Sequence, residues 1–236
     1  MLREISMLDQ AQQDILWKHI QSNARDLFDS SYPRLRYLVK YCRPRSRVLN
    51  IGVGSGELEK MLIKRGVEVW SLDPCAETIA RLQDDLAMGD RAAQGYSQAI
   101  PFQDQHFDKV IMTEVLEHLP DDILDATLDE VYRVLKSGGI FTGTVPYREN
   151  LRDNEAVCPN CQLQFHRWGH QQSFDKVSLV DLLIKHGFNI DKLYPCSFPD
   201  FRRRGVKLFI KSIFRYVLGR MGEGLVGPNL YFISKK

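Results

Sequence analysis

Two cysteines and two histidines lie close together in the stretch CPNCQLQFHRWGH, residues 158–170. Cys158 and Cys161 are separated by two residues, and His166 and His170 follow with four and three residues between them. Thiolates and imidazoles at such spacing can fill all four positions of a tetrahedral, structural zinc site. The alternative is a pair of free thiols, with the histidines hydrogen-bonded inside a loop. We predict zinc, because a metal would order a segment that has no core of its own.

A glycine-rich loop, GVGSGE at 52–57, follows one apolar run and precedes a helical stretch. Strand, loop and helix in this order form a nucleotide site at the carboxyl end of a strand. Gly52 and Gly54 allow a ligand to approach the backbone closely, and Gly56 fits the turn into the helix. A pyrophosphate loop needs another glycine where this chain has Glu57. The loop therefore predicts a nucleoside cofactor without phosphates, since a carboxylate opposes phosphate at a helix N-terminus.

Asp73 follows the next apolar run, VEVWSL, about twenty residues after the glycine loop. An acidic side chain at this place can accept hydrogen bonds from both hydroxyls of a ribose. The alternative is that Asp73 merely starts a helix together with Pro74. The glycine loop nearby favours the ribose role.

Apolar runs alternate with helical stretches over residues 47–145, which is typical of crossovers in a doubly wound, mostly parallel α/β sheet. The expected strands are 47–52, 67–72, 92–97, 107–113 and 140–145, and the expected helices are 57–65, 76–86 and 121–135. This order places the glycine loop and Asp73 at the same edge of the sheet.

The rest of the chain is expected to complete a single domain, 1–236, around this core. Residues 1–46 predict a helical cap, and 146–172 an irregular lid that holds the Cys/His motif. In the last part, 173–236, Ser173 is expected to cap a helix. Two final strands are expected at 188–194 and 229–234.

The composition is typical of a globular cytoplasmic protein, with 44% hydrophobic and 26% charged residues. Five cysteines, an odd number at uneven spacing, favour a reducing compartment. The first residues lack the apolar segment of a secretory signal, and no apolar run approaches the roughly 18 residues of a membrane span. A net charge of +2 gives no general attraction to nucleic acid, so DNA is not an expected partner.

Four linked motifs within 47–145 carry a resemblance to a known family. They are VLNIGVGSGELE, VWSLDP, IPFQDQHFDKVIMTEVLEHLPDD and RVLKSGGIF. In these motifs the chain resembles the class I S-adenosylmethionine-dependent methyltransferases. The resemblance implies a Rossmann-like seven-stranded sheet of order 3-2-1-4-5-7-6 with the last strand antiparallel. It also implies S-adenosylmethionine as cofactor and methyl transfer by in-line displacement.

The same resemblance assigns residues to the cofactor. Gly52, Gly54 and Gly56 would line its methionine and ribose. Asp73 would bind the ribose hydroxyls, and Glu114 would lie beside the cofactor at the end of the fourth strand.

Two positions depart from the family pattern. Asn50 stands where members usually have an acidic residue, so the cofactor's ammonium group would be held partly from elsewhere. Tyr96 stands where many members have an aspartate that contacts the adenine amine. Ser97 or backbone groups would take over that contact.

His118, in EVLEHL just after the fourth strand, is the candidate general base for an acceptor hydroxyl. The alternative is a histidine that only orders its loop. His170 has two candidate roles. The chain resembles a subset of these methyltransferases that carries CPxC and FHRWGH after the fifth strand, which favours a metal. In relatives without the cysteines, a histidine at the place of His170 often faces the active site.

A basic insert, 201–220, combines apolar residues at helical spacing with seven cations and no acid. It is either a docked helix with a solvated rim or a site for anionic lipid or a phosphate-bearing substrate. The expected acceptor is a hydroxyl or amine of a small metabolite, such as a sugar or a lipid-linked intermediate. The alternatives are an RNA methyltransferase and a non-catalytic binding module of the same fold.

Overall fold

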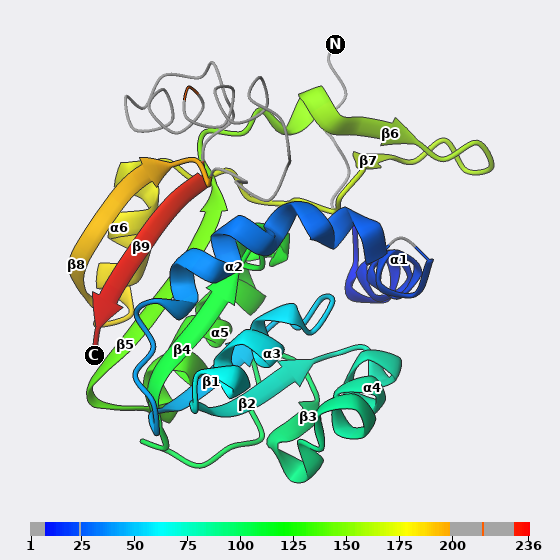
Figure 1. Ribbon diagram of the computed structural model, residues 1–236. Coiled ribbons are helices and arrows are strands. Elements are labelled where there is room, and N and C mark those ends of the chain that lie inside the picture. Colours follow the sequence, from blue (N-terminus) through cyan, green and yellow to red (C-terminus); the bar gives the residue numbers. More distant parts are fainter. Residues whose placement is uncertain (1–7, 24, 199–213, 215–228) are drawn as a thin grey trace.

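Short apolar runs form the strands of one seven-stranded sheet in the computed structural model (Figure 1), which describes residues 8–23, 25–198, 214 and 229–236. The strands in sheet order are β3 (Ala92–Gln94), β2 (Glu68–Asp73), β1 (Arg47–Ile51), β4 (Phe107–Thr113), β5 (Leu135–Pro146), β9 (Asn229–Lys235) and β8 (Asn189–Cys196). A separate hairpin pairs β6 (Glu155–Val157) with β7 (Gln164–His166).

The strand order agrees with the one that the family resemblance implies. Strands β1 to β5 pair in parallel, and β9 is antiparallel to both β5 and β8. Once the hairpin is set aside, β8 and β9 are the sixth and seventh strands of the sheet, which gives 3-2-1-4-5-7-6.

Helices cover both faces of the sheet, as their apolar stripes require. One core cluster joins α5 (Asp121–Val134) and α6 (Lys176–Lys185) to the sheet. The other joins α2 (Tyr32–Val39), α3 (Glu57–Lys64) and α4 (Ala76–Leu86) to the opposite face. The alternation of apolar runs and helices over 47–145 therefore predicted the layers correctly.

Several expected boundaries were wrong, among them strand 92–97, which ends at Gln94, and strand 140–145, which begins at Leu135. Helix α6 begins after Asp175 and not after Ser173, because the Asp175 carboxylate accepts from the backbone N–H groups of Val177 and Ser178, both at 2.9 Å. The Ser173 hydroxyl instead donates to the Glu149 carbonyl at 2.6 Å. Helix α5 ends at Val134, because Leu135 already pairs with Phe107 as the start of β5.

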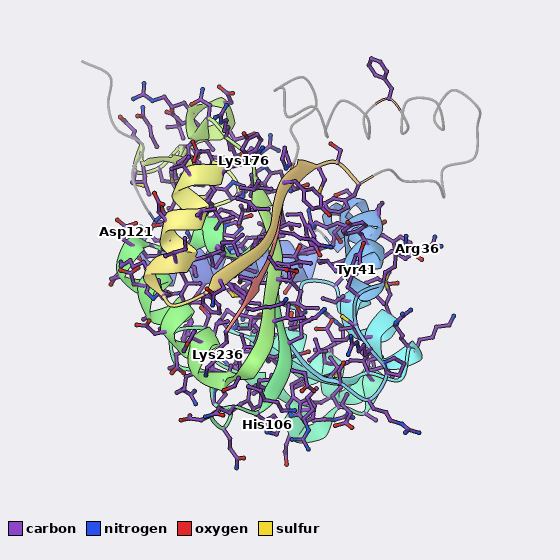
Figure 2. The ribbon with its side chains drawn as sticks, turned by 90° about the vertical axis from the view of Figure 1, so that its left-hand side faces the viewer. Arg36, Tyr41, His106, Asp121, Lys176 and Lys236 are labelled. Atoms are coloured by element: carbon purple, nitrogen blue, oxygen red, sulfur yellow. The ribbon has the colours of Figure 1, made fainter. Side chains whose placement is uncertain are left out.

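The carboxyl ends of the parallel strands meet at one edge of the sheet, and the remaining segments gather there. Figure 2 shows His106, just before β4, at the opposite end of the molecule from Lys176, which starts α6. Helix α1 (Gln10–Asn23) lies beside the carboxyl edge, and the β6–β7 hairpin extends away from it (Figure 1).

The basic insert at 201–220 falls outside the described residues except for Phe214, so its expected roles stay predictions. Among the helices in the described ranges, none is long and apolar enough to span a membrane.

Candidate active site

A cavity of about 550 Å³ opens at the carboxyl edge, within the size range of small-molecule sites. Four strands deliver their following loops to it: β1, β2, β3 and β4. Its other walls come from α1, from the start of α2, and from the segment after β7. The lining includes Asn50, Gly52, Gly54, Asp73, Ser97, Glu114, His118 and His170. Apart from Gly56, the residues that the sequence suggested for cofactor binding and for the general base therefore line one cavity.

The glycine loop adopts the conformation that its glycines predicted. Gly52, Gly54 and Gly56 all have positive φ, at 85°, 58° and 79°. A Cβ atom on Gly52 would lie 2.6 Å from Cγ2 of Val115, which no side chain tolerates without movement. Gly52 and Gly54 line the cavity, whereas Gly56 caps α3 next to Leu82. The missing side chains of Gly52 and Gly54 leave room for Val115 and Phe28, and the loop backbone reaches the cavity wall.

We predict that Gly52→Ala lowers the free energy of unfolding more than Gly138→Ala. Both glycines have positive φ, so both substitutions carry the backbone strain of about 1–2 kcal/mol. Only Gly52 adds the clash with Val115, because Gly138 has open space around its Cα. We expect an additional loss of about 1–3 kcal/mol at Gly52, measured by urea unfolding. Equal losses at the two positions would contradict the close packing of the loop.

Asp73 is 1% exposed at the end of β2, and its carboxylate organises the glycine loop. It accepts from the backbone N–H groups of Val53 and Cys75, each at 2.9 Å. The Gln21 amide of α1 donates to the same carboxylate over longer distances of 3.3 and 3.5 Å. Burial raises the pKa of Asp73, while these hydrogen bonds oppose that rise. The carboxylate therefore joins the loop, the strand end and α1, and the long Gln21 contacts are the ones that a ligand's hydroxyls can replace.

Asn50 occupies the place where the family resemblance expects an acid, and a nearby carboxylate orients it. Its side-chain amide donates to Glu59 at 2.7 Å, and the hydroxyl of Ser71 donates to the same oxygen at 2.9 Å. Burial raises the pKa of Glu59, which is fully buried behind the loop. Asn50 lines the cavity, and its carbonyl oxygen is buried without a hydrogen-bond partner among the described residues.

Helix α1 closes one side of the cavity through polar side chains. Asp14 accepts from the Tyr96 hydroxyl at 2.7 Å, which ties the helix to the loop after β3. Gln21 accepts from Thr78 at 2.6 Å, which ties it to α4. Gln13 donates to the backbone carbonyl of Gly169 at 2.8 Å. Tyr96, at the position where relatives often have aspartate, therefore helps to hold a cover over the cavity.

Ser97 and Glu114 both line the cavity but differ in their freedom to contact a ligand. The Ser97 hydroxyl is 2.8 Å from the hydroxyl of Thr127. Glu114 has φ of 55°, a strained value for a residue that is not glycine. Its two carboxylate oxygens accept from Asn229 at 2.9 Å, and one lies 3.4 Å from Nη1 of Arg34. Glu114 is thus fixed at the end of β4, beside the glycine loop.

The other end of the cavity is built on the short helix η3 (Leu116–His118), which follows β4. His118 is 9% exposed, and its ring packs edge-on against Trp17 of α1 at 4.7 Å. Burial, followed by the nearby His170, lowers the pKa of His118 well below its usual value. Glu117 is fully buried, and burial, followed by Glu114, raises its pKa well above the usual range.

His170 reaches this end from the segment after β7. Its Nδ1 lies 2.5 Å from the Glu149 carboxylate, and its ring packs against His118 at 4.7 Å. His166 stacks on His170 at 4.3 Å and lies behind it. The backbone N–H groups of Gln171 and Gln172 donate to the Glu117 carbonyl at 2.7 and 3.0 Å. The two segments are therefore joined, and His170 faces the cavity.

The structure does not bring the four predicted zinc ligands, Cys158, Cys161, His166 and His170, together in one group. In the described part of the chain, the groups of three or more candidate ligands are Glu117, His118 and His170, and Glu149, His166 and His170. The cysteines close the turn at the tip of the hairpin, where the Cys158 carbonyl accepts from Gln162 at 2.9 Å.

The extended conformation of β7 explains why the cysteines and His166 lie apart. His166 pairs with Glu155 at the base of the hairpin, so extended residues separate it from the tip by roughly 10 Å. Hydrogen bonds from the backbone of Cys161 and Asn160 lower the pKa of the Cys158 thiol. The spacing of the cysteines and histidines predicted a compact loop, but this segment forms a β-hairpin instead.

Several residues of the site were not predicted from the sequence. The polar face of α1, with Gln13 and Gln21 eight residues apart, is a helical repeat that could have indicated its contacts. Glu117 stands next to a predicted residue, in EVLEHL. Glu149 lies in a loop without any local pattern, and only the fold brings it to the histidines.

Comparison with known proteins gives the family. A family model described as a methyltransferase domain matches residues 17–193. An uncharacterized methyltransferase of Geobacillus thermodenitrificans is 28% identical over 155 residues, which cover 61% of this chain and 69% of that protein.

Two solved structures share the fold. A chain from the Haloferax volcanii complex of the Trm112 methyltransferase activator with a methyltransferase has a TM-score of 0.68 at 18% identity, covering 98% of this chain and 99% of that one. The 1,6-didemethyltoxoflavin-N1-methyltransferase of Burkholderia thailandensis, bound to its substrate and S-adenosylhomocysteine, has a TM-score of 0.66 at 15% identity, covering 99% and 93%. Since the family model matches well over half of the sequence, the chain belongs to the methyltransferase domain family.

Proposed function

We propose that the protein transfers a methyl group from S-adenosylmethionine to a hydroxyl or amine of a small metabolite. One observation carries this proposal. Gly52 and Gly54 of the glycine loop, the buried Asp73 at the end of β2 and Glu114 at the end of β4 all line one cavity.

These residues fit the cofactor group by group. A glycine loop that carries Glu57 at the helix start suits a nucleoside without phosphates. Asp73 can accept from the ribose hydroxyls in place of the long Gln21 contacts. Asn50 and Glu114 offer oxygen atoms suited to an ammonium group. When bound, S-adenosylmethionine supplies an electrophilic methyl group.

The histidine end of the cavity suits the acceptor. Trp17 of α1 and Trp168 form part of the same wall, so an acceptor there is screened from water. Holding the acceptor in line with the methyl group can contribute about 7–11 kcal/mol to catalysis. A hydroxyl acceptor must also lose a proton, and we propose that the group around His118 removes it.

Enclosure favours a small acceptor over RNA. The cavity lies under α1, which is held by the Tyr96 hydroxyl on its Asp14 and by the Thr78 hydroxyl on its Gln21. A polynucleotide would have to displace this helix to reach the histidine end. The Burkholderia neighbour acts on a small heterocyclic molecule, which supports the same size class for this chain.

Titration calorimetry with S-adenosylhomocysteine tests the cofactor. We expect binding of one molecule per chain, and no binding of ATP or NAD, because Glu57 repels phosphates. Absence of S-adenosylhomocysteine binding would overturn the proposal.

A second assay tests the acceptor class. Labelled S-adenosylmethionine is incubated with small-molecule and RNA fractions of a cell extract. We expect label in the small-molecule fraction. Label in RNA would support an RNA methyltransferase, and cofactor binding without any labelled product would support a binding module.

A further inference from the structure

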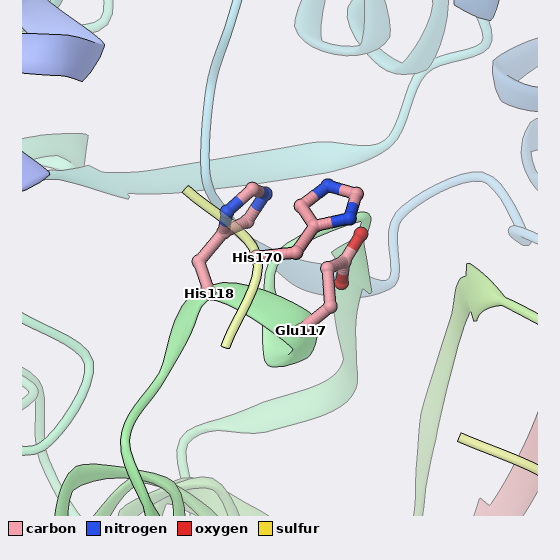
Figure 3. A group of neighbouring side chains, drawn as sticks. All are labelled: Glu117, His118 and His170. Carbon is pink, nitrogen blue, oxygen red and sulfur yellow. The ribbon is translucent and has the colours of Figure 1, made fainter. Parts of the chain in front are cut away.

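We propose that Glu117, His118 and His170 form a site for one divalent transition-metal ion at the histidine end of the cavity. One candidate ligand atom from each residue lies within 4.8 Å of the other two. Figure 3 shows the three side chains gathered together, two from η3 and one from the segment that crosses it. This inference goes beyond the proposed function, and only its catalytic consequence rests on that function.

Both imidazoles have a nitrogen lone pair available for a metal. His118 hydrogen-bonds to the backbone of Gly169, while its Nδ1 has no partner among the described residues. The bonded nitrogen is therefore Nε2, and Nδ1 is left bare. In His170, Nδ1 is engaged by the Glu149 carboxylate, so Nε2 is the nitrogen that remains. A carboxylate or a carbonyl behind each imidazole is the usual support of a metal-binding histidine.

Glu117 supplies an anionic ligand that otherwise has no partner. It is 0% exposed, and within the described residues no group other than its own backbone N–H bonds to its carboxylate. Burying a carboxylate without a partner is strongly unfavourable. Glu114 and Glu149 add negative charge nearby, and Arg34 is the cation that acts on Glu117. A divalent cation would satisfy the oxygens and balance this charge.

The backbone holds these ligands in place without a metal. The Glu117 carbonyl accepts from Gln171 and Gln172, which ties the His170 segment to η3. Gln13 reaches the carbonyls of both His118 and Gly169, at 3.3 and 2.8 Å. Such a site is preorganised, so a metal would bind with little loss of chain entropy.

His166 is excluded as a ligand by its own hydrogen bonds. Its Nδ1 accepts from the backbone N–H groups of Trp168 and His170, at 3.4 and 3.1 Å. The proton of the neutral ring is therefore on Nε2, which lies 3.4 Å from Glu149. His166 thus supports Glu149, and Glu149 in turn supports His170.

Two imidazoles and one carboxylate favour first-row transition ions such as Mn²⁺, Fe²⁺, Co²⁺ or Zn²⁺ over Mg²⁺ or Ca²⁺. His118 and His170 line the cavity, so free coordination positions would open toward it. An acceptor oxygen bound there would have a lowered pKa and would lose its proton more easily. The ion would therefore stabilise the deprotonated acceptor, and the released proton would pass to a solvent molecule in place of His118.

The test uses the full-length protein, stripped with a chelator and titrated with Mn²⁺ and Co²⁺. We expect one ion per chain by calorimetry, and Co²⁺ absorption bands without the near-ultraviolet band of a thiolate ligand. Glu117→Gln and His170→Ala should each weaken binding by more than about tenfold. His186→Asn is the matched control, because His186 binds Asp125 and Asp129 away from the cavity.

Cys158→Ser/Cys161→Ser separates this site from the hairpin tip. The double variant should bind the metal as the parent protein does. Loss of binding in the double variant, with binding retained in Glu117→Gln, would assign the ion to the cysteines and overturn the proposal. Failure of the parent protein to bind either ion would also overturn it.

Binding of S-adenosylhomocysteine is measured in the same samples. It reports folding of the variants, and it tells a failed metal site from a failed cofactor assignment. Metal binding without S-adenosylhomocysteine binding would support the metal site and contradict the proposed function. S-adenosylhomocysteine binding without metal binding would support the proposed function and contradict the metal site.

Discussion

Asp73→Ala is expected to lower the affinity for S-adenosylhomocysteine by at least about a hundredfold. A hydrogen bond to a charged group contributes about 1.5–3 kcal/mol, and a ribose offers two hydroxyls to this carboxylate. The substitution also leaves the N–H groups of Val53 and Cys75 without their acceptor, so the glycine loop loses its anchor. Titration calorimetry measures the affinity, and urea unfolding measures the accompanying loss of stability.

Asp84→Ala is the control, because Asp84 lies exposed on the neighbouring helix α4. It should leave affinity and stability unchanged. Asp73→Asn keeps the shape of the side chain but only one acceptor oxygen, so its affinity should fall between those of the parent and Asp73→Ala. Normal affinity in Asp73→Ala would remove the ribose assignment and leave Asp73 with a purely structural role at the start of α4.

The core of the fold was predictable because local signals and tertiary contacts agree there. Strands such as 107–113 are apolar on both faces, since helices cover both faces of the sheet. The glycines of the loop have positive φ, a conformation that other residues rarely adopt. In both cases a short stretch of sequence carries the whole physical reason for its conformation.

The cover of the cavity could not be predicted in the same way. In α1 the buried side chains are Gln13, Ile20 and Gln21, whereas Ile15 is 71% exposed. An apolar period therefore misidentifies the inward face of this helix, because its contacts are hydrogen bonds to distant segments. Gln13 reaches residue 169, and Gln21 reaches residue 73. Such pairings depend on the assembled fold, and the spacing of Gln13 and Gln21 indicates only that they share a helix face, not which residues they contact.

The Cys/His segment shows the opposite failure, in which a local pattern was clear and misleading. Metal-site spacing counts residues along the chain, but distance depends on the backbone conformation. Strand β7 separates Cys161 from His166, and Glu149 takes the place of the thiolates beside the histidines. The hydrogen bond between His170 and Glu149 then holds the His170 side chain at the cavity, with His166 3.4 Å from the same carboxylate.

The contacts of α1 reach both ends of the cavity. Each single hydrogen bond at the rim, such as that from Tyr96 to Asp14, contributes only about 0.5–1.5 kcal/mol, so the helix is held by several contacts together. Its inner face meets Asp73 at one end and the backbone of His118 at the other. Helix α1 therefore contacts both the Asp73 end and the His118 end of the cavity.

His118→Ala is expected to lower turnover by about 10²- to 10⁴-fold, the usual contribution of proton removal. Affinity for S-adenosylhomocysteine should change by less than about threefold, because Asp73 and the glycine loop lie at the other end of the cavity. Burial lowers the pKa of His118, so its ring is neutral and can offer a lone pair either to a proton or to a metal ion. The measurement pairs steady-state kinetics with calorimetry, and His186→Asn serves as the control.

A chelator distinguishes the two ways in which His118 can act. If a metal ion held by His118 lowers the pKa of the acceptor, chelation lowers the turnover of the parent protein to that of His118→Ala, and added Mn²⁺ restores only the parent. If His118 takes the proton directly, the parent protein keeps its turnover after chelation. Unchanged turnover in His118→Ala would leave the histidine with an ordering role alone, in which its ring packs against Trp17 and holds α1 in place over the cavity.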